Sequence, residues 1–510
     1  MSITATLDVA GVAVPAAIRI DPADNVAVAL RPVAAGEAVT AGGRTVIAAH
    51  AIDLGHKIAL EPIAHGADVR RYGWPIGRAT VAIAAGDHVH SHNLVTKLSG
   101  EEPYRYDPIP AFPAALTTPR HFAGYVRPDG SVGTRNQIWV LPTVGCVGRT
   151  AQRVAVQAGQ RLAAPGSGGI KGVSAFFHPF GCSQLGNDLD NTAQILASLA
   201  CHPNAGGVLL IGLGCEENQL AALIERIPAP HRERLRTVSA QASADEVGDA
   251  GRAIAELAEI ASGDRRETVS LGALRLGLKC GGSDGFSGLT ANPLIGRAAD
   301  AVTAAGGTAL LTEVPELFGA ERLLMARARD EAVFASLVTL INGFKRYFLD
   351  HGESVSENPS PGNVAGGITT LEEKSLGAVQ KGGRSPVADV IRYGERVRGP
   401  GLTVLEAPGN DAVSTTALAA AGATLTLFST GRGTPLGSPV PTMKLASNHG
   451  LAARKPGWID FDAGQVLDEG LDVTTEALLD RVCAIASGEP ARNEVNEEKE
   501  IAIWKRGVTL

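Results

Sequence analysis

The sequence predicts an α/β protein with a small β-rich domain at its amino terminus, followed by two α/β domains with largely parallel sheets. Residues 1–95 consist of short β-type runs such as NVAVAL and KIALEPI, and no long helical period interrupts them. From about residue 122, apolar runs such as QIWVLPTVG and GVLLIGLG alternate with helical stretches. This alternation is typical of βαβ units and a parallel sheet.

Two changes in composition mark the expected domain boundaries. Residues 96–120 contain EEPYRYDPIPAFPAALTTPR, whose prolines disfavour helix and predict a semi-extended linker. GDRRET then separates a helix from the strand run LRLGLKC, so we expect α/β domains over 121–267 and 268–510. In the last domain we expect strands at GTALLTEV, LTVLEAP, ATLTLFST and PTMKLAS, helices near 291–305, 319–329 and 332–349, and a peripheral charged tail after Ile485.

Composition disfavours several classes of protein. The net charge of −7 and the lack of a basic patch give no reason to expect nucleic acid as a partner. No apolar run is long enough to cross a membrane, and the start MSITATLDVAGVAV predicts no signal peptide. Six cysteines in 510 residues are too few for a disulfide scaffold and fit a cytoplasmic protein. GxxxxGK[ST] and HExxH do not occur, which disfavours a P-loop and a zincin.

Four cysteines follow predicted strands, where α/β sheets bind their ligands. They are Cys146, Cys182, Cys215 and Cys280. Thiolate and imidazole suit iron or zinc, and carboxylates suit iron or manganese. The predicted metal ligands are therefore Cys182, Cys215, Cys280, His178 and Glu216. A small buried hydrophobic residue is the alternative for each cysteine, and it is the one we expect for Cys201 and Cys483.

The first domain offers a second group of polar side chains. GDHVHSHNL places His88, His90 and His92 two residues apart, so on a strand they point to one face. GHKIAL adds His56 and Lys57 in the same domain. Converging imidazoles predict a metal or substrate site. A hydrophilic strand edge in contact with solvent is the alternative.

Four glycine-rich loops carry the remaining candidates. In CGGSDGFSGLTANP the glycines let the backbone approach a ligand, and we expect Ser283 and Asp284 to face substrate, with helix capping as the alternative. GYVRPDGSVGTRNQ, SENPSPGNVAGGITTLEEK and STGRGTPLGSPVPTMK suit small anions, because guanidinium groups pair with carboxylates. The predicted substrate-binding residues are Arg135, Asn136, Asn292, Asn358, Asn363, Thr369, Thr370, Arg432, Thr434 and Lys444.

Long motifs occur throughout the chain, namely GYVRPDGSVGTRN, HPFGCSQ, GLGCE, CGGSDGFSGLTANP, TEVPELFGAE, NPSPGN, GGITTLEEKSLGAVQKGG and FSTGRGTPLGSPVP. In sequence and in order, these motifs resemble the altronate/galactarate dehydratase family. The first domain resembles the family's SAF-type β-clip domain. TEVPELFGAE and ITTLEEKSLGAVQKGG are more similar to the altronate branch. Val364 follows NPSPGN where a lysine is common in the family, which leaves the exact substrate open.

The resemblance implies a hydro-lyase that converts an aldonate such as D-altronate to a 2-keto-3-deoxy acid with the help of Fe(2+) or Mn(2+). Such a reaction needs a base for the C2 proton, stabilisation of the enediolate and an acid for the C3 hydroxyl. A divalent metal would supply a Lewis acid. We expect Lys57 or a histidine among His56, His88 and His90 to act as the base or acid.

Several alternatives stay open at this point. Galactarate or another aldarate is an alternative substrate, and a sulfolactate-type sulfo-lyase is an alternative enzyme on the same scaffold. A non-enzymatic regulator is disfavoured, because the thiols and the CGGSD loop are intact. A [4Fe-4S] cluster held by Cys182, Cys215 and Cys280 is the alternative cofactor. We expect a small sugar acid as the partner, no nucleic acid and no membrane, and the sequence is compatible with a homo-oligomer.

Overall fold

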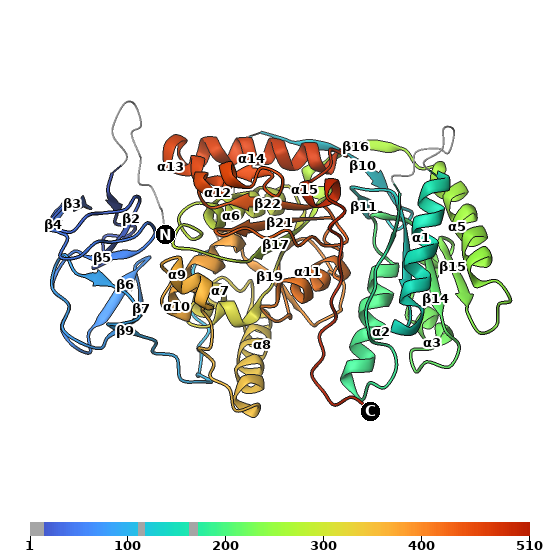
Figure 1. Ribbon diagram of the computed structural model, residues 1–510, viewed down its shortest axis with the longest axis horizontal. Coiled ribbons are helices and arrows are strands. Elements are labelled where there is room, and N and C mark those ends of the chain that lie inside the picture. Colours follow the sequence, from blue (N-terminus) through green and yellow to red (C-terminus); the bar gives the residue numbers. More distant parts are fainter. Residues whose placement is uncertain (1–14, 111–117, 163–171) are drawn as a thin grey trace.

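The computed structural model describes residues 15–110, 118–162 and 172–510 of the chain (Figure 1). The stretch MSITATLDVAGVAV, on which the expectation of no signal peptide rests, lies outside these residues. Among the described helices, none is both long and apolar enough to cross a membrane. Three domains follow one another along the longest axis of the molecule, with the first domain at one end and the second at the other (Figure 1).

The first domain is built from short antiparallel strands, as the sequence predicted. They pair in the orders β1-β2-β5-β8, β3-β4 and β6-β7-β9. Alternate residues such as Val39, Ile58 and Val69 are fully buried, because successive side chains of a strand point to opposite faces. Ile58 of β5 lies opposite His88 of β8, so GHKIAL and GDHVH are neighbours. The strands are β1 Ala17–Ile18, β2 Val26–Ala29, β3 Ala38–Ala41, β4 Arg44–Ile47, β5 Lys57–Ala59, β6 Asp68–Arg71, β7 Trp74–Ala79, β8 His88–Val89 and β9 Leu94–Val95.

The linker continues along the third domain in an extended form. Within residues 96–110 the structure contains neither helix nor strand, in agreement with the proline content. The Tyr104 hydroxyl donates to Glu321, the Tyr106 hydroxyl to the Ala328 carbonyl. These contacts attach the linker to the third domain.

The second domain contains a parallel sheet with the order β13-β12-β14-β15. Helices α1 and α5 cover one face, where Ile138, Leu209 and Ile254 are buried (Figure 1). The antiparallel sheet β11-β10-β16 flanks this unit. The elements are β10 His121–Val126, β11 Val132–Gly133, β12 Gln137–Pro142, η1 Gly145–Val147, α1 Gly148–Leu162, β13 Val173–Ala175, α2 Asn187–Ala200, β14 Ala205–Gly212, α3 Leu220–Glu225, α4 Ala229–Arg232, β15 Leu235–Ser239, α5 Glu246–Ser262 and β16 Arg266–Ser270.

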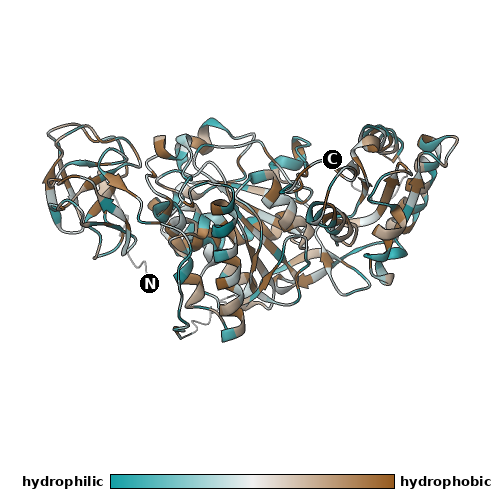
Figure 2. Cartoon of the chain, turned by 90° about the horizontal axis from the view of Figure 1, so that it is seen from below, coloured by the Kyte–Doolittle hydropathy of each residue, from teal (hydrophilic) through white to brown (hydrophobic). Residues whose placement is uncertain are grey.

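The third domain contains a seven-stranded parallel sheet with the order β19-β20-β18-β17-β21-β22-β23. Its central strands are buried on both faces, which explains their continuous apolar sequences, and they are mostly brown in Figure 2. The strands are β17 Arg275–Cys280, β18 Thr308–Leu311, β19 Val387–Ile391, β20 Gly401–Leu405, β21 Leu425–Thr430, β22 Thr442–Ala446 and β23 Phe461–Asp462.

The helices of the third domain agree with three of the expected ranges: α6 Ala291–Ala304, α7 Glu321–Met325 and α8 Glu331–Asp350. Helix α8 begins where the Asp330 carboxylate accepts a hydrogen bond from the Val333 amide, an ordinary N-cap. The remaining helical segments are η2 Leu271–Ala273, η3 Val314–Leu317, α9 Pro361–Ala365, α10 Leu371–Ala378, η4 Val379–Gly382, α11 Asp411–Ala420, α12 His449–Arg454, η5 Ala463–Gln465, α13 Val466–Glu469, α14 Leu471–Ala486 and α15 Arg492–Val495.

The expectation of a peripheral carboxyl-terminal tail is wrong. Ile501, Ile503 and Trp504 are buried. The Trp504 ring stacks on Phe344 at 5.2 Å between ring centroids. The apolar run IAIW therefore packs against the third domain, although charged residues surround it in the sequence. The last residue, Leu510, donates its amide to the Ser183 carbonyl of the second domain, so the tail joins the two α/β domains.

Candidate functional site

The first and third domains meet at the ligand-binding edge of the seven-stranded sheet. The chain enters this sheet at β17, adds β18 on one side and later adds β21 on the other, so the topological switch point lies between β17 and β21. The Gly431 and Arg432 amides both donate to the Gly282 carbonyl, which joins the loops after these strands. A Cβ on Gly285 would lie 2.2 Å from the Gly55 carbonyl oxygen. The first domain thus packs directly onto the CGGSDGFSG loop.

A buried ion-pair group forms the centre of this junction. The Lys57 ammonium donates to the Glu373 carboxylate at 2.9 Å and to the Gly367 carbonyl at 2.7 Å. Arg71 donates to the other oxygen of Glu373 and, at 2.7 Å, to the Gly285 carbonyl. Lys57 and Arg71 come from the first domain and Glu373 from α10, so one carboxylate binds two cations across the domain boundary.

Burial in this group brings the pKa of Lys57 close to physiological pH. Burial lowers the pKa of Lys57 to about 8, because the charged ammonium loses its hydration, and the attraction of Glu373 offsets only part of this effect. Burial alone would raise the pKa of Glu373, but Lys57 and Arg71 outweigh burial and lower it to about 2. Lys57 is therefore a group that exchanges a proton near physiological pH beside a permanent anion.

The histidines of the first domain gather above α9. The His56 ring stacks on His90 with 4.8 Å between centroids, and His88 lies 5.5 Å from His92. Burial, followed by the neighbouring imidazoles His56 and His90, lowers the pKa of His88 to about 3. His56 Nδ1 lies 3.0 Å from His88 Nε2, and His90 Nε2 lies 3.1 Å from the Val364 carbonyl. The structure thus brings the predicted histidines together in one group.

A second charged group lies behind the junction at the end of β17. Lys381 Nζ lies 2.6 Å from Cys280 Sγ and 2.9 Å from Glu313, which also binds Lys279. Glu316 accepts from the Cys280 thiol at 3.4 Å. Burial, together with Glu313, raises the pKa of Cys280 to about 12, which keeps the sulfur protonated. Every member is buried, so the lysines and glutamates compensate one another's charge in a dry environment.

Lys374 connects this group to a small pocket at the junction. Its ammonium lies 2.8 Å from Glu316 and 3.0 Å from the Asn358 side-chain oxygen. The pocket is lined by Arg71, Tyr72, Ser283, Asp284, Ser287, Gly288, Asn292, Ile368, Glu373, Lys374 and Gly377. Arg71 Nε is buried without a hydrogen-bond partner. An anionic group could satisfy that donor, because buried polar atoms are rarely left unpaired.

Several predicted loop residues build the walls of this site. Ser283 and Asn292 line the pocket. Asn363 donates to the Ser283 carbonyl at 2.8 Å, and the Thr369 hydroxyl donates to Glu373 at 2.7 Å. Thr370 caps α10 and donates to the Ile76 carbonyl of the first domain, so its role is structural.

The Asp284 carboxylate accepts hydrogen bonds from several protein groups. It accepts from the Ser287 amide and hydroxyl, the Phe286 amide, the Ser447 hydroxyl at 2.8 Å and the Asn448 amide at 3.0 Å. The structure shows the capping role that was the alternative, and Asp284 also lines the pocket, so its contact with substrate stays a prediction. Asp284 fixes the shape of the CGGSD loop and orients the pocket wall.

Other predicted residues lie outside the junction pocket. Arg135 pairs with Glu494 at 2.6 Å, and Asn136 donates to the Ala261 carbonyl at 2.9 Å. The Lys444 ammonium donates to the Pro435 carbonyl at 2.6 Å. These three predicted substrate contacts are structural in this geometry, because their polar groups are bound to protein. Of the same set, Arg432 is exposed at the sheet edge, and the Thr434 hydroxyl accepts from the Leu436 amide.

Two predicted metal ligands in the second domain are hydrogen-bonded to protein groups. His178 Nε2 donates to the Pro142 carbonyl at 2.8 Å, and its Nδ1 accepts from the Phe180 amide at 3.3 Å. Glu216 accepts from the Thr143 hydroxyl at 2.6 Å and from the Gly214 amide at 2.5 Å. Both side chains hold the loops at the end of the four-stranded sheet.

The three cysteines predicted to share a cluster lie in two domains. Cys280 is buried in the third domain against Lys381. Cys182 and Cys215 are exposed on loops of the second domain. The structure therefore does not bring Cys280 together with the other two thiols.

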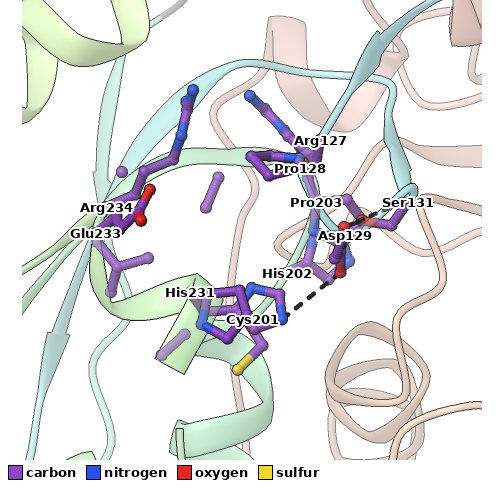
Figure 3. A pocket seen from close by; sticks show the side chains of 15 residues that line it. Arg127, Pro128, Asp129, Ser131, Cys201, His202, Pro203, His231, Glu233 and Arg234 are labelled. Atoms are coloured by element: carbon purple, nitrogen blue, oxygen red, sulfur yellow. Dashed lines mark hydrogen bonds and ion pairs between the residues drawn. The ribbon is translucent and has the colours of Figure 1, made fainter. Parts of the chain in front are cut away.

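A larger pocket in the second domain is lined by paired charges (Figure 3). Arg127 and Arg234 both bind Asp264, at 2.8 and 2.7 Å. His231 lies 3.6 Å from Asp129. These side chains are thus bound to one another, whereas the junction pocket is lined by Arg71, whose Nε has no hydrogen-bond partner.

The decisive residues that we did not predict are Arg71, Glu373 and Lys374, with Lys381 and Glu313 behind them. Their motifs, ITTLEEKSLGAVQKGG and TEVPELFGAE, supported the family resemblance but no site role. Arg71 lies in ADVRRYG, which has the appearance of an ordinary strand edge.

Known proteins match all three domains. Family models match residues 15–97 (altronate/galactarate dehydratase SAF domain), 124–262 (D-galactarate dehydratase/altronate hydrolase, second domain) and 271–509 (D-galactarate/altronate dehydratase, C-terminal). An altronate dehydratase of Escherichia coli (strain K12) is 50% identical over 494 residues, which are 97% of this chain and 99% of the relative. An altronate dehydratase of Bacillus subtilis (strain 168) is 48% identical over 500 residues, 97% and 99%. A galactarate dehydratase (L-threo-forming) of Escherichia coli (strain K12) is 32% identical over 459 residues, 86% of each.

Proposed function

The chain belongs to the altronate/galactarate dehydratase family and is a hydro-lyase that dehydrates a sugar acid, and we propose that it converts D-altronate to a 2-keto-3-deoxy acid at the junction of the first and third domains. The observation that carries this proposal is the buried Lys57–Glu373 pair beside a pocket with an unpaired Arg71 nitrogen. The similarity to two altronate dehydratases over nearly the whole chain supports the choice of substrate. A location in the cytoplasm stays a prediction from the cysteine content.

Lys57 is the proposed proton-transfer group. Its pKa of about 8 leaves an appreciable neutral fraction near physiological pH, and a neutral amine can accept the C2 proton. Glu373 stays ionised beside it and stabilises the ammonium that forms. Lys57 is fully buried, so the substrate reaches it when the contact between the domains opens.

One cation from each of the two domains is suited to hold the substrate carboxylate and the enediolate. Lys374 lines the pocket, and Arg71 presents its unpaired Nε there. Negative charge grows on the carboxylate oxygens as the C2 proton leaves, so fixed cations stabilise the enediolate more than the substrate. Ser283 is suited to contact a hydroxyl group, whereas the side chain of Asn292 is bound to the Gly377 carbonyl and the Ser429 hydroxyl and supports the pocket wall.

The junction does not offer an evident place for the expected Fe(2+) or Mn(2+). Among the described residues, Cys280, Glu313 and Glu316 have atoms able to bind a metal ion within 4.8 Å of one another. The ammonium groups of Lys381 and Lys374 already contact Cys280 and Glu316. The His56 and His90 nitrogens are hydrogen-bonded. Metal dependence stays a prediction that removal and return of each ion would test.

The substrate is tested by measuring keto-acid formation from D-altronate and galactarate, and sulfite release from sulfolactate. We expect kcat/KM for D-altronate to exceed that for galactarate by about tenfold or more, because a site built to bind one pattern of hydroxyl groups rejects the other. Faster turnover of galactarate would assign the chain to aldarate dehydration. Sulfite release as the main activity would make it a sulfo-lyase.

The pH dependence of kcat/KM tests the role of Lys57. A base must be deprotonated, so kcat/KM should rise with pH and level off above about pH 8. Glu373→Gln removes the charge that raises the pKa of Lys57, so the rising limb of the kcat/KM profile should move to lower pH. Arg71→Gln removes a charge that lowers that pKa and should move the limb to higher pH. A limb that stays in place in both variants would contradict the assignment.

A further inference from the structure

Three exposed thiols surround the ligand-binding edge of the second domain's sheet. The chain enters this sheet at β12, adds β13 on one side and then β14 on the other, so the switch point lies between β12 and β14. Cys146 follows β12, Cys215 follows β14, and Cys182 lies on the loop after β13. All three are free and exposed. The position where α/β sheets bind ligands is thus lined by thiols.

Direct hydrogen bonds bring the three loops together. The Gly145 amide donates to the Phe180 carbonyl at 2.8 Å, and the Asn218 amide donates to the Gly181 carbonyl at 3.0 Å. The Asn218 side chain donates to the Thr143 carbonyl at 3.0 Å. Gly181 has a φ of 103°, and a Cβ there would lie 2.1 Å from the Thr143 carbonyl oxygen. Only glycine lets these backbones approach so closely beside the cysteines.

The exposure and the surroundings of the thiols favour ligand binding over packing. Free cysteine is among the most often buried residue types, as Cys201 and Cys280 are here. Cys146 lies in the turn that leads into α1. The Gln241 side chain donates to Cys215 Sγ at 3.4 Å.

The three thiols are free and exposed, whereas both ring nitrogens of His178 and both carboxylate oxygens of Glu216 are hydrogen-bonded to protein groups. Among the described residues, the three sulfurs are not a group whose atoms all lie within 4.8 Å of one another. A single tetrahedral ion with metal–sulfur bonds of about 2.3 Å needs sulfurs only about 3.8 Å apart. Wider spacing suits a polynuclear cluster.

We propose that Cys146, Cys182 and Cys215 hold a four-iron iron–sulfur cluster at this switch point, with one iron that no protein thiolate binds. Cys146 thus takes the place that the sequence suggested for Cys280. The proposal is independent of the junction pocket, because the ligands come only from second-domain loops.

The test is anaerobic reconstitution of the full chain with ferrous iron and sulfide. We expect about four iron and four labile sulfide per chain and an iron–sulfur electron paramagnetic resonance spectrum after reduction. Cys146→Ser, Cys182→Ser and Cys215→Ser should each lose most of the iron and sulfide. Cys280→Ser and Cys483→Ser are matched controls and should keep both. Urea unfolding of each variant identifies any loss that arises from misfolding.

Three results would overturn the proposal. They are retention of the cluster in the triple serine variant, loss in Cys280→Ser but not in Cys146→Ser, and uptake of iron or zinc at the thiols without sulfide. Lys57→Gln should reconstitute fully whatever its activity. The cluster proposal and the proposed dehydration can therefore be refuted independently of each other.

Discussion

Lys57→Gln is expected to lower kcat for D-altronate by about 10²–10⁴-fold, the usual contribution of a positioned acid or base. The amide keeps a hydrogen-bonding group near Glu373 and Gly367 but cannot accept the C2 proton. Glu373 retains Arg71 as its partner, so the fold should persist. Steady-state kinetics with D-altronate measure the effect, and the unfolding midpoint reports the integrity of the fold.

Lys97→Gln is the matched control on the same domain. Its ammonium binds Asp68 at 2.8 Å, and 47% of its side chain is exposed. An exposed pair of this kind contributes little, so activity should stay within about twofold of the unchanged chain. Retention of more than about a third of the activity by Lys57→Gln would mean that Lys57 is structural and that another group moves the proton.

Glu313→Gln is expected to destabilise the chain by about 3–5 kcal/mol, the cost of breaking a buried ion pair by removing one partner. The Glu313 carboxylate binds Lys381 at 2.9 Å, contacts Lys279 and accepts from the Cys280 amide at 3.0 Å. All these side chains are buried. The substitution keeps the shape but leaves two ammonium groups short of negative charge.

Urea unfolding followed by circular dichroism measures this effect. Glu476→Gln is the control, because Glu476 pairs with Arg120 at 2.7 Å with 51% of its side chain exposed. It should cost less than about 1 kcal/mol. Equal stabilities of the two variants would show that the charges behind the junction are hydrated and do not form a dry group.

Much of the fold could be predicted because its pattern is local. Alternation of apolar and helical runs predicted both parallel sheets, and the apolar run before Cys280 became β17 at the switch point. The spacing of His88 and His90 placed them on one face. These features depend on periods of two or of about four residues, which a single sequence displays directly.

The charged partners could not be predicted, because they are distant in the sequence. Arg71 and Glu373 are separated by 302 residues, and Lys381 and Cys280 by 101. No local pattern specifies such a pair, and a lysine or glutamate in isolation predicts a solvated surface. The buried tail was missed for a related reason. IAIW is a short apolar run among charged residues, and Phe344, on which its tryptophan stacks, is distant in the sequence.

The location of the site is tested most directly by a crystal structure of the Lys57→Gln variant of the full chain with D-altronate. The account predicts the sugar acid in the junction pocket, with its carboxylate within hydrogen-bond distance of Arg71 or Lys374. A sugar acid bound between Arg127 and Arg234, or at the cysteine loops of the second domain, would contradict the account.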